Sequence, residues 1–256
     1  MLRRRAIATV FCVMVALGTQ ARASALGGFR ISDQIALTAE GASLTLQVLA
    51  DSRITPALAG ELWQEPADQI IATQARPGLV ESLDRRPFLP ARLRLLGADG
   101  SILGQAQLGG PVAKLKRLKL SERPAGDSDA QVVAVTVADP SQSEGYTGTI
   151  TTLYQVGPSV LKELAATDES GRQAPITLRA SVKSAWQASP KSTPFEIRQV
   201  ICRPDFDAAT PASDALPFKV SYISYRLVNG AWQKEQRTGK GFWEDDQAFP
   251  VAEKFP

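Results

Sequence analysis

Carboxylates are the groups most able to carry chemistry in this sequence, because its 256 residues include no histidine. Without an imidazole there is no Ser-His-Asp or Cys-His arrangement, no histidine base and no histidine-containing zinc site. Two acidic groups remain, Asp205 with Asp207, and Glu244 to Asp246. Paired carboxylates serve glycosidases and also bind calcium. Neither group has the spacing of a calcium loop, so we favour solvated loops, with the loop from Pro204 to Asp214 as the better calcium site.

Cys202 is the one thiol expected in the mature chain, because Cys12 lies in a predicted export signal. The neighbouring Arg203 favours a thiolate, as in a nucleophilic or redox cysteine. The chain offers neither a histidine nor a second cysteine to complete such a site. We therefore favour the interpretation of Cys202 as a small, buried apolar residue, and we expect no internal disulfide.

A short basic segment combines Lys114, Lys116, Arg117 and Lys119 with three leucines between positions 114 and 120. Such a segment suits an anionic surface, for example lipid headgroups or a glycan polymer. An edge strand that uses lysines against edge-to-edge aggregation has the same composition. We favour the edge strand.

Aromatic residues and prolines gather in the last part of the chain, from Gly241 to Pro256. Phe242, Trp243 and Glu244 are our predicted binding residues, because aromatic faces stack on sugars and peptides. The alternative is a terminal strap whose rings close one end of the sheet. We favour the strap as the structural role of this segment.

The first 25 residues predict an export signal. Arg3 to Arg5 form a basic start, and Ala6 to Leu17 form an apolar run too short to span a membrane. Small residues offer cleavage after Ala25 or after Ala23. We expect a periplasmic or secreted protein without a transmembrane segment after signal removal. Export by the general secretory route is preferred to the twin-arginine route, and a lipid anchor on Cys12 is not expected.

Strands must position all of these residues, because apolar and polar side chains alternate along most of the chain. The centre of this pattern is Ile176 to Trp186, which predicts one strand with a single buried face. Glycine-containing turns predict hairpins around Gly41 and around Gly97 to Gly100, and the pair Asn229-Gly230 predicts a type I′ turn.

These patterns predict an all-β, mostly antiparallel protein with a sandwich or open-barrel-like meander in its C-terminal half. We expect a signal peptide at 1–25, an N-terminal β-rich domain at 26–120 and a linker at 121–130. A C-terminal antiparallel β domain would follow at 131–240, and the strap at 241–256. The segment Pro56 to Arg76 is irregular, and we assign it no structure.

The composition disfavours several classes of function. Removal of the four arginines before position 26 brings the formal charge of +3 close to zero, which argues against a nucleic-acid partner. The sequence has no Gly-rich phosphate loop, CxxC motif or metal-ligand spacing, and we predict no cofactor and no metal. We expect a non-enzymatic binding or envelope-associated protein whose partner is an envelope protein or glycan. The alternatives are a carboxylate-dependent hydrolase of a cell-wall polysaccharide, with Glu244 or Asp205 as acid or base, and a secreted effector or inhibitor.

Overall fold

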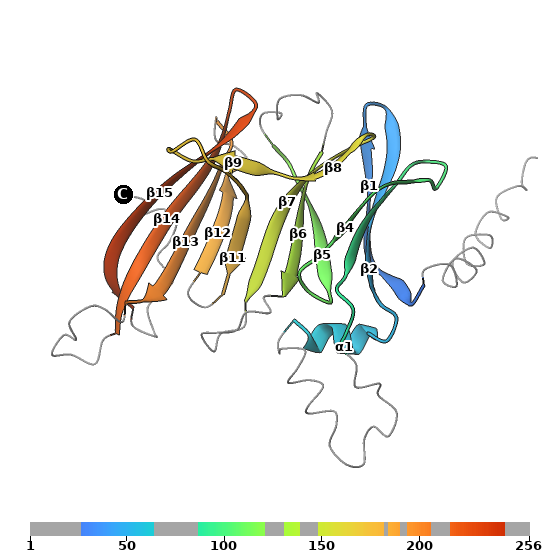
Figure 1. The fold of residues 1–256 in the computed structure, drawn as a ribbon, viewed down its shortest axis with the longest axis horizontal. Coiled ribbons are helices and arrows are strands. Elements are labelled where there is room, and N and C mark those ends of the chain that lie inside the picture. Colours follow the sequence, from blue (N-terminus) through green and yellow to red (C-terminus); the bar gives the residue numbers. More distant parts are fainter. Residues whose placement is uncertain are drawn as a thin grey trace, which may run out of the picture.

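Three layered β-sheets make up the described part of the protein, and their strands are mostly antiparallel (Figure 1). In this computed structural model the described residues are 27–63, 87–120, 131–138, 148–181, 184–189, 194–205 and 216–243. The expected all-β, mostly antiparallel fold class is confirmed. Across the described residues the strands form open sheets and do not close into a barrel.

The N-terminal sheet consists of two hairpins in the order β1-β2-β3-β4. Its strands are β1 Phe29–Ala39, β2 Ala42–Asp51, β3 Arg92–Leu96 and β4 Ile102–Gln107. The turn between β1 and β2 has positive φ at Glu40 (51°) and Gly41 (73°), as a type I′ turn requires. Both hairpins predicted from glycine-containing turns in this region are present.

The middle sheet has the order β11-β7-β6-β5, with β8 paired to β7. Its strands are β5 Ala113–Leu118, β6 Gln131–Ala138, β7 Thr149–Gly157, β8 Val160–Glu163 and β11 Thr177–Ala180. In β6, Val133 and Val135 pack toward the N-terminal sheet, whereas Val132 and Ala134 pack toward the C-terminal sheet. A strand that is apolar at consecutive positions suits burial on both faces. The middle sheet therefore lies between the other two (Figure 1).

The C-terminal sheet has the order β10-β9-β15-β14-β13-β12. Its strands are β9 Ala165–Thr167, β10 Gln173–Pro175, β12 Ser184–Ser189, β13 Glu196–Pro204, β14 Leu216–Val228 and β15 Ala231–Trp243. In β14, Ile223 and Tyr225 face the core shared with the middle sheet. Val220 and Tyr222 face a small outer cluster that contains Cys202. Both faces of this strand thus carry apolar side chains.

The stretch from Ile176 to Trp186 does not form the single strand that its alternation predicts. Its first part is β11 in the middle sheet, and its last part belongs to β12 in the C-terminal sheet. An isolated antiparallel bridge joins Ser181 to Ser184, so the chain reverses between the two sheets. The prediction was wrong because Leu178 and Trp186 pack into the same core from opposite sheets, so the apolar alternation continues through the reversal.

The N-terminal sheet contacts the middle sheet along two pairs of strands. Between β1 and β5, a bulge in β1 directs Asp33 toward β5, and its Oδ2 accepts the backbone N–H of Leu115 at 2.8 Å. Between β4 and β8, a Cβ at Gly104 would lie 3.1 Å from Cβ of Leu161. The absence of a side chain at Gly104 therefore permits the close approach of β8.

A short helix, α1 Pro56–Glu61, covers the end of the N-terminal sheet (Figure 1). Thr55 caps it by accepting the N–H of Leu58 at 3.2 Å, and Pro56 fills the first turn, where no N–H is needed. Leu58 and Leu62 are buried against the end of β2. No helix in the described part of the chain is long and apolar enough to cross a membrane.

The segment 121–130, predicted as a linker between two β-rich parts, lies outside the described residues. Its flanking strands β5 and β6 are hydrogen-bonded neighbours in one sheet. Residues 26–120 and 131–240 therefore contribute strands to a shared sheet and to a shared core. The predicted signal peptide, with Ala23 and Ala25, also lies outside the described residues.

Candidate functional site

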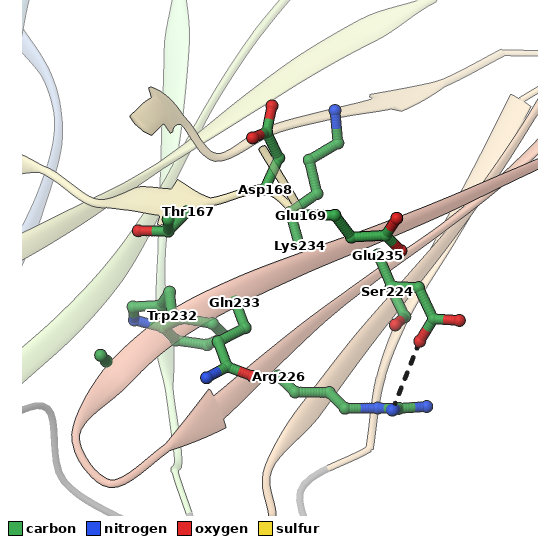
Figure 2. A pocket seen from close by; sticks show the side chains of 10 residues that line it. Thr167, Asp168, Glu169, Ser224, Arg226, Trp232, Gln233, Lys234 and Glu235 are labelled. Carbon is green, nitrogen blue, oxygen red and sulfur yellow. Dashed lines mark hydrogen bonds and ion pairs between the residues drawn. The ribbon is translucent and has the colours of Figure 1, made fainter. Parts of the chain in front are cut away.

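A polar hollow lies where the β9–β10 turn approaches the β14–β15 hairpin (Figure 2). Its volume is about 490 Å³. Its walls combine three carboxylates, two cations, an amide, hydroxyls and an indole, from Thr167, Asp168, Glu169, Ser224, Arg226, Ala231, Trp232, Gln233, Lys234 and Glu235. Figure 2 shows Trp232 and Thr167 at one end, and Ser224 and Glu235 at the other.

The β14–β15 hairpin supplies most of this lining. Asn229 and Gly230 have φ angles of 49° and 75°, so the type I′ turn predicted from this pair is confirmed. The turn fixes a register in which Arg226 lies opposite Gln233, and Leu227 lies opposite Trp232. Because side chains alternate along a strand, Trp232 enters the core and Gln233 faces outward.

The β9–β10 turn supplies the acidic wall. Oδ1 of Asp168 accepts hydrogen bonds from the hydroxyl of Ser170 at 2.6 Å and from the N–H of Arg172 at 2.9 Å. These bonds, with that of Ser170 the largest cause, hold the pKa of Asp168 below its ordinary value. Asp168 therefore stays ionised and holds the turn, in which Gly171 has a φ of 80°.

An alternating row of charges crosses the outer face of the C-terminal sheet and forms one side of the hollow. Glu196 bridges Arg198 at 2.8 Å and Arg226 at 3.0 Å. Arg226 reaches Glu235 at 3.5 Å, and Glu235 also binds Arg237 at 2.8 Å. In this row every arginine contacts a glutamate, so its charge is largely compensated within the protein.

Two buried polar atoms of the lining have no hydrogen-bond partner within the described part of the chain. They are the hydroxyl of Ser224, a residue 1% exposed, and the indole N–H of Trp232, which is 4% exposed. The Trp232 ring packs edge-on against Phe195, with centroids 5.9 Å apart. An unpaired buried donor or acceptor costs about 1–3 kcal/mol. Each such atom calls for an explanation, for example an ordered water, an ion or a bound group.

The hollow is better suited to binding than to acid–base chemistry. A general acid near neutral pH needs a carboxyl whose pKa is raised. Asp51, Asp99 and Asp168 instead have pKa values lowered by hydrogen bonds from Arg53, Ser101 and Ser170. Glu235 is held between two arginines. In the hollow, the carboxylates of Asp168 and Glu235 thus act as hydrogen-bond and ion-pair acceptors.

Of the acidic and thiol residues singled out in the sequence, Asp205 and Cys202 are described, and neither lines this hollow. Asp205 is 4% exposed, and its carboxylate lies 2.8 Å from Nζ of Lys219. Asp207 and Glu244 lie outside the described residues. Cys202 is 2% exposed and packs with Val200, as expected for a small apolar residue. In the described residues no group of three or more His, Cys, Asp or Glu is placed to hold a metal ion.

The aromatic tail begins as part of a strand. Phe242 and Trp243, our predicted binding residues, lie in β15 and pair with Pro217 and Leu216 of β14. The strap was expected to begin at Gly241, and its first three residues are therefore in the sheet. Its remainder, from Glu244 onward, lies outside the described residues.

Lys114, Lys116 and Arg117 lie on β5, the edge strand of the middle sheet, and Lys119 follows it, so the expected edge position is confirmed. Lys114, Lys116, Arg117 and Lys119 are all exposed. The amide Gln233 and the cation Lys234 were not identified as site residues from the sequence. Their position directly after the Asn229-Gly230 turn was the available signal, because strand ends next to tight turns border open space.

Comparisons with protein-family profiles, with curated proteins and with solved structures found no match for this chain.

Proposed function

We propose that this protein is an exported, non-catalytic binding protein that recognises a glycan of the cell envelope in the hollow beside β15. The observation that carries the proposal is the pair of buried, unpaired polar atoms, Ser224 Oγ and Trp232 Nε1, in the lining of one polar hollow. The indole can only donate a hydrogen bond, whereas the hydroxyl can donate or accept. Because both atoms are buried, a hydroxyl-rich ligand would hydrogen-bond to them only when side chains of the lining move aside.

The size and charge of the hollow favour a glycan over a protein partner. Its volume of about 490 Å³ falls within the range of about 300–1,000 Å³ typical of small-ligand sites. Carboxylates and cations are nearly balanced in its walls. Asp168 and Glu235 offer acceptors, while Gln233 and Lys234 offer donors. A neutral, hydroxyl-rich ligand can use both kinds of group without leaving a charge unpaired.

The alternative of a polysaccharide hydrolase has less support. Such enzymes need one carboxyl that is protonated at the working pH. Asp168 has a lowered pKa, and Glu235 is paired with Arg226 and Arg237. Release of reducing ends from peptidoglycan by the purified protein would favour the hydrolase and would contradict our proposal.

Export rests on the basic and apolar start of the chain, from Arg3 to Leu17. N-terminal sequencing of the protein recovered from the periplasm or medium should give a first residue directly after Ala25 or Ala23. Recovery of a cytoplasmic protein that begins at Met1 would contradict export.

Calorimetric titration with oligomers of N-acetylglucosamine tests the binding site. These oligomers carry hydroxyl and acetamide groups that both donate and accept. We expect saturable binding, and Gln233→Ala should weaken it about tenfold, the equivalent of one lost hydrogen bond of about 1.4 kcal/mol. Gln105→Ala, an exposed amide on β4, is the matched control and should bind as the unaltered protein does. Equal affinities for the two variants, or no binding to these oligomers, would refute the proposal.

A further inference from the structure

Four cations lie on and just after the edge strand of the middle sheet, far along the chain from the hollow. We define them as the cationic strip, which consists of Lys114, Lys116, Arg117 and Lys119. Because side chains alternate along a strand, Lys116 and Arg117 project from opposite faces of β5. All four side chains are exposed, and among the described strands β5 has a hydrogen-bonded neighbour of its own sheet on one side only. At about 3.3 Å per residue, the strip is about 16 Å long.

Ion pairs within the described residues do not compensate the charge of the strip. Among the described residues, no carboxylate forms an ion pair with a member of the strip. Asp33 approaches β5, but its Oδ2 is engaged by the backbone N–H of Leu115. The arginines of the C-terminal sheet differ, because Arg198 and Arg226 each contact Glu196. Uncompensated cations in a row attract an anionic partner.

Aromatic side chains lie at the α1 end of the strip. Nζ of Lys114 lies 4.6 Å from the ring centre of Trp63, which follows α1 and is half-buried. Phe88, also half-buried, packs with Trp63 against the α1 cluster and lies under the guanidinium of Arg53 at 5.2 Å. Leu89 next to it is 44% exposed. Tryptophan rings and long cationic side chains both suit the headgroup region of a membrane.

We propose that the cationic strip and the adjoining end of the molecule, at Trp63 and Leu89, dock on an anionic phospholipid surface. Three of the four cations are lysines, which act as point charges and do not require the bidentate geometry of a fixed ligand. The apolar contribution of Trp63 and Leu89 suits the headgroup boundary and has no counterpart on a soluble polyanion. This inference does not depend on the proposed glycan site.

Vesicle sedimentation of the protein recovered after export tests the proposal, with vesicles of phosphatidylcholine alone and of phosphatidylcholine with phosphatidylglycerol. We expect binding only to the anionic vesicles, and loss of binding at about 1 M salt, where the Debye length is about 3 Å. Each lysine or arginine near such a surface strengthens binding about fivefold. The double variant Lys116→Gln with Lys119→Gln should therefore bind about 25-fold more weakly.

A matched control removes the same charge elsewhere. Lys162 on β8 and Arg203 on β13 are exposed, and neither belongs to the strip. Lys162→Gln with Arg203→Gln should bind within about twofold of the unaltered protein, because exposed charges beyond a Debye length are screened. Equal urea midpoints for the two double variants would show that folding is not the cause of the difference.

Three results would overturn the proposal. Equal weakening by both double variants would show that net charge acts without the strip. Binding to neutral vesicles that persists in salt would show that an apolar segment mediates attachment. Binding to soluble polygalacturonate without binding to the anionic vesicles would identify an acidic glycan as the partner of the strip in place of a membrane.

Discussion

Replacement of Asp51 by asparagine should remove the best-defined electrostatic anchor of the N-terminal sheet. Asp51 ends β2 and is 2% exposed. Its carboxylate binds Nη2 of Arg53 at 2.6 Å and accepts the N–H of Leu89 at 3.1 Å. Arg53 in turn donates to the carbonyl of Pro87 at 2.9 Å. One carboxylate thus fixes the chain where it returns toward β3.

The size of the effect follows from the pKa of Asp51. The hydrogen bonds of the Arg53 side chain are the largest cause that lowers it from 3.8 to about 2, against the opposing effect of burial. At about 1.36 kcal/mol for each pKa unit, the ionised carboxylate contributes about 2.5 kcal/mol to stability at neutral pH. Because the folded pKa is the lower one, this contribution is present above about pH 4 and is lost as the pH falls to about 2.

Urea unfolding at neutral pH and at low pH measures this contribution. At pH 7 we expect Asp51→Asn to lower the free energy of unfolding by about 2.5 kcal/mol. Below pH 2 the variant and the unaltered protein should differ much less, because Asp51 is then protonated. Asp99→Asn, at the exposed β3–β4 turn, is the control and should have only a small effect. Equal stability of Asp51→Asn and the unaltered protein at pH 7, or a difference that does not shrink in acid, would refute this reasoning.

Three further substitutions test the charge row, the hollow and the packing by the same urea assay. Glu196→Gln should lower the free energy of unfolding by about 2 kcal/mol, because the Glu196 side chain is 9% exposed and lies between two arginines. Glu235→Gln should lower it by under about 1 kcal/mol, because the Glu235 side chain is 33% exposed. Equal losses of stability in the two variants would contradict this expectation. Ser224→Ala should raise the free energy of unfolding by about 1 kcal/mol, because it removes a buried hydroxyl without a described partner. A loss of stability would show that the hydroxyl has a partner and would contradict this expectation. Gly148→Ala should lower the free energy of unfolding by about 1–3 kcal/mol, since the added Cβ would lie 3.0 Å from the backbone carbonyl oxygen of Ala180. Gly109→Ala has open space around it and should be neutral, so an equal cost at both glycines would contradict the steric argument.

The fold class and the hairpins were predictable because both are local properties of the chain. Asn229-Gly230 and Glu40-Gly41 adopt the positive φ angles that tight turns need. Alternation of apolar residues then identified the strands between the turns.

The assignment of strands to sheets was not predictable from such patterns. Alternation shows that a side chain is buried, but it does not show which neighbouring sheet buries it. Leu178 and Trp186 therefore appeared to share a strand, although they come from two sheets that enclose one core. The same limit applies to β6, in which Val132 and Val133 contribute to different cores.

The hollow was not predictable because its members are brought together by a single pairing between strands distant in sequence. β9 pairs with β15 only at Thr167 and Gln233, in a parallel bridge. No sequence spacing encodes this pairing, which places Asp168 beside a hairpin more than fifty positions away. By contrast, the basic residues of the strip all lie between positions 114 and 119 and were recognised directly.

The two proposed surfaces lie at opposite ends of the molecule, which makes their joint use testable. In Figure 1, β9 lies at one end of the C-terminal sheet, whereas α1, next to the start of the strip, lies at the other end of the layered structure. A membrane docked at Trp63 and Lys114 would therefore leave the hollow open to a glycan. We expect the calorimetric affinity for oligomers of N-acetylglucosamine to be unchanged by saturating phosphatidylglycerol vesicles, since separate sites without a shared conformational change have no coupling free energy. A tenfold loss of affinity, equivalent to about 1.4 kcal/mol of coupling, would mean that the membrane covers the hollow or alters it.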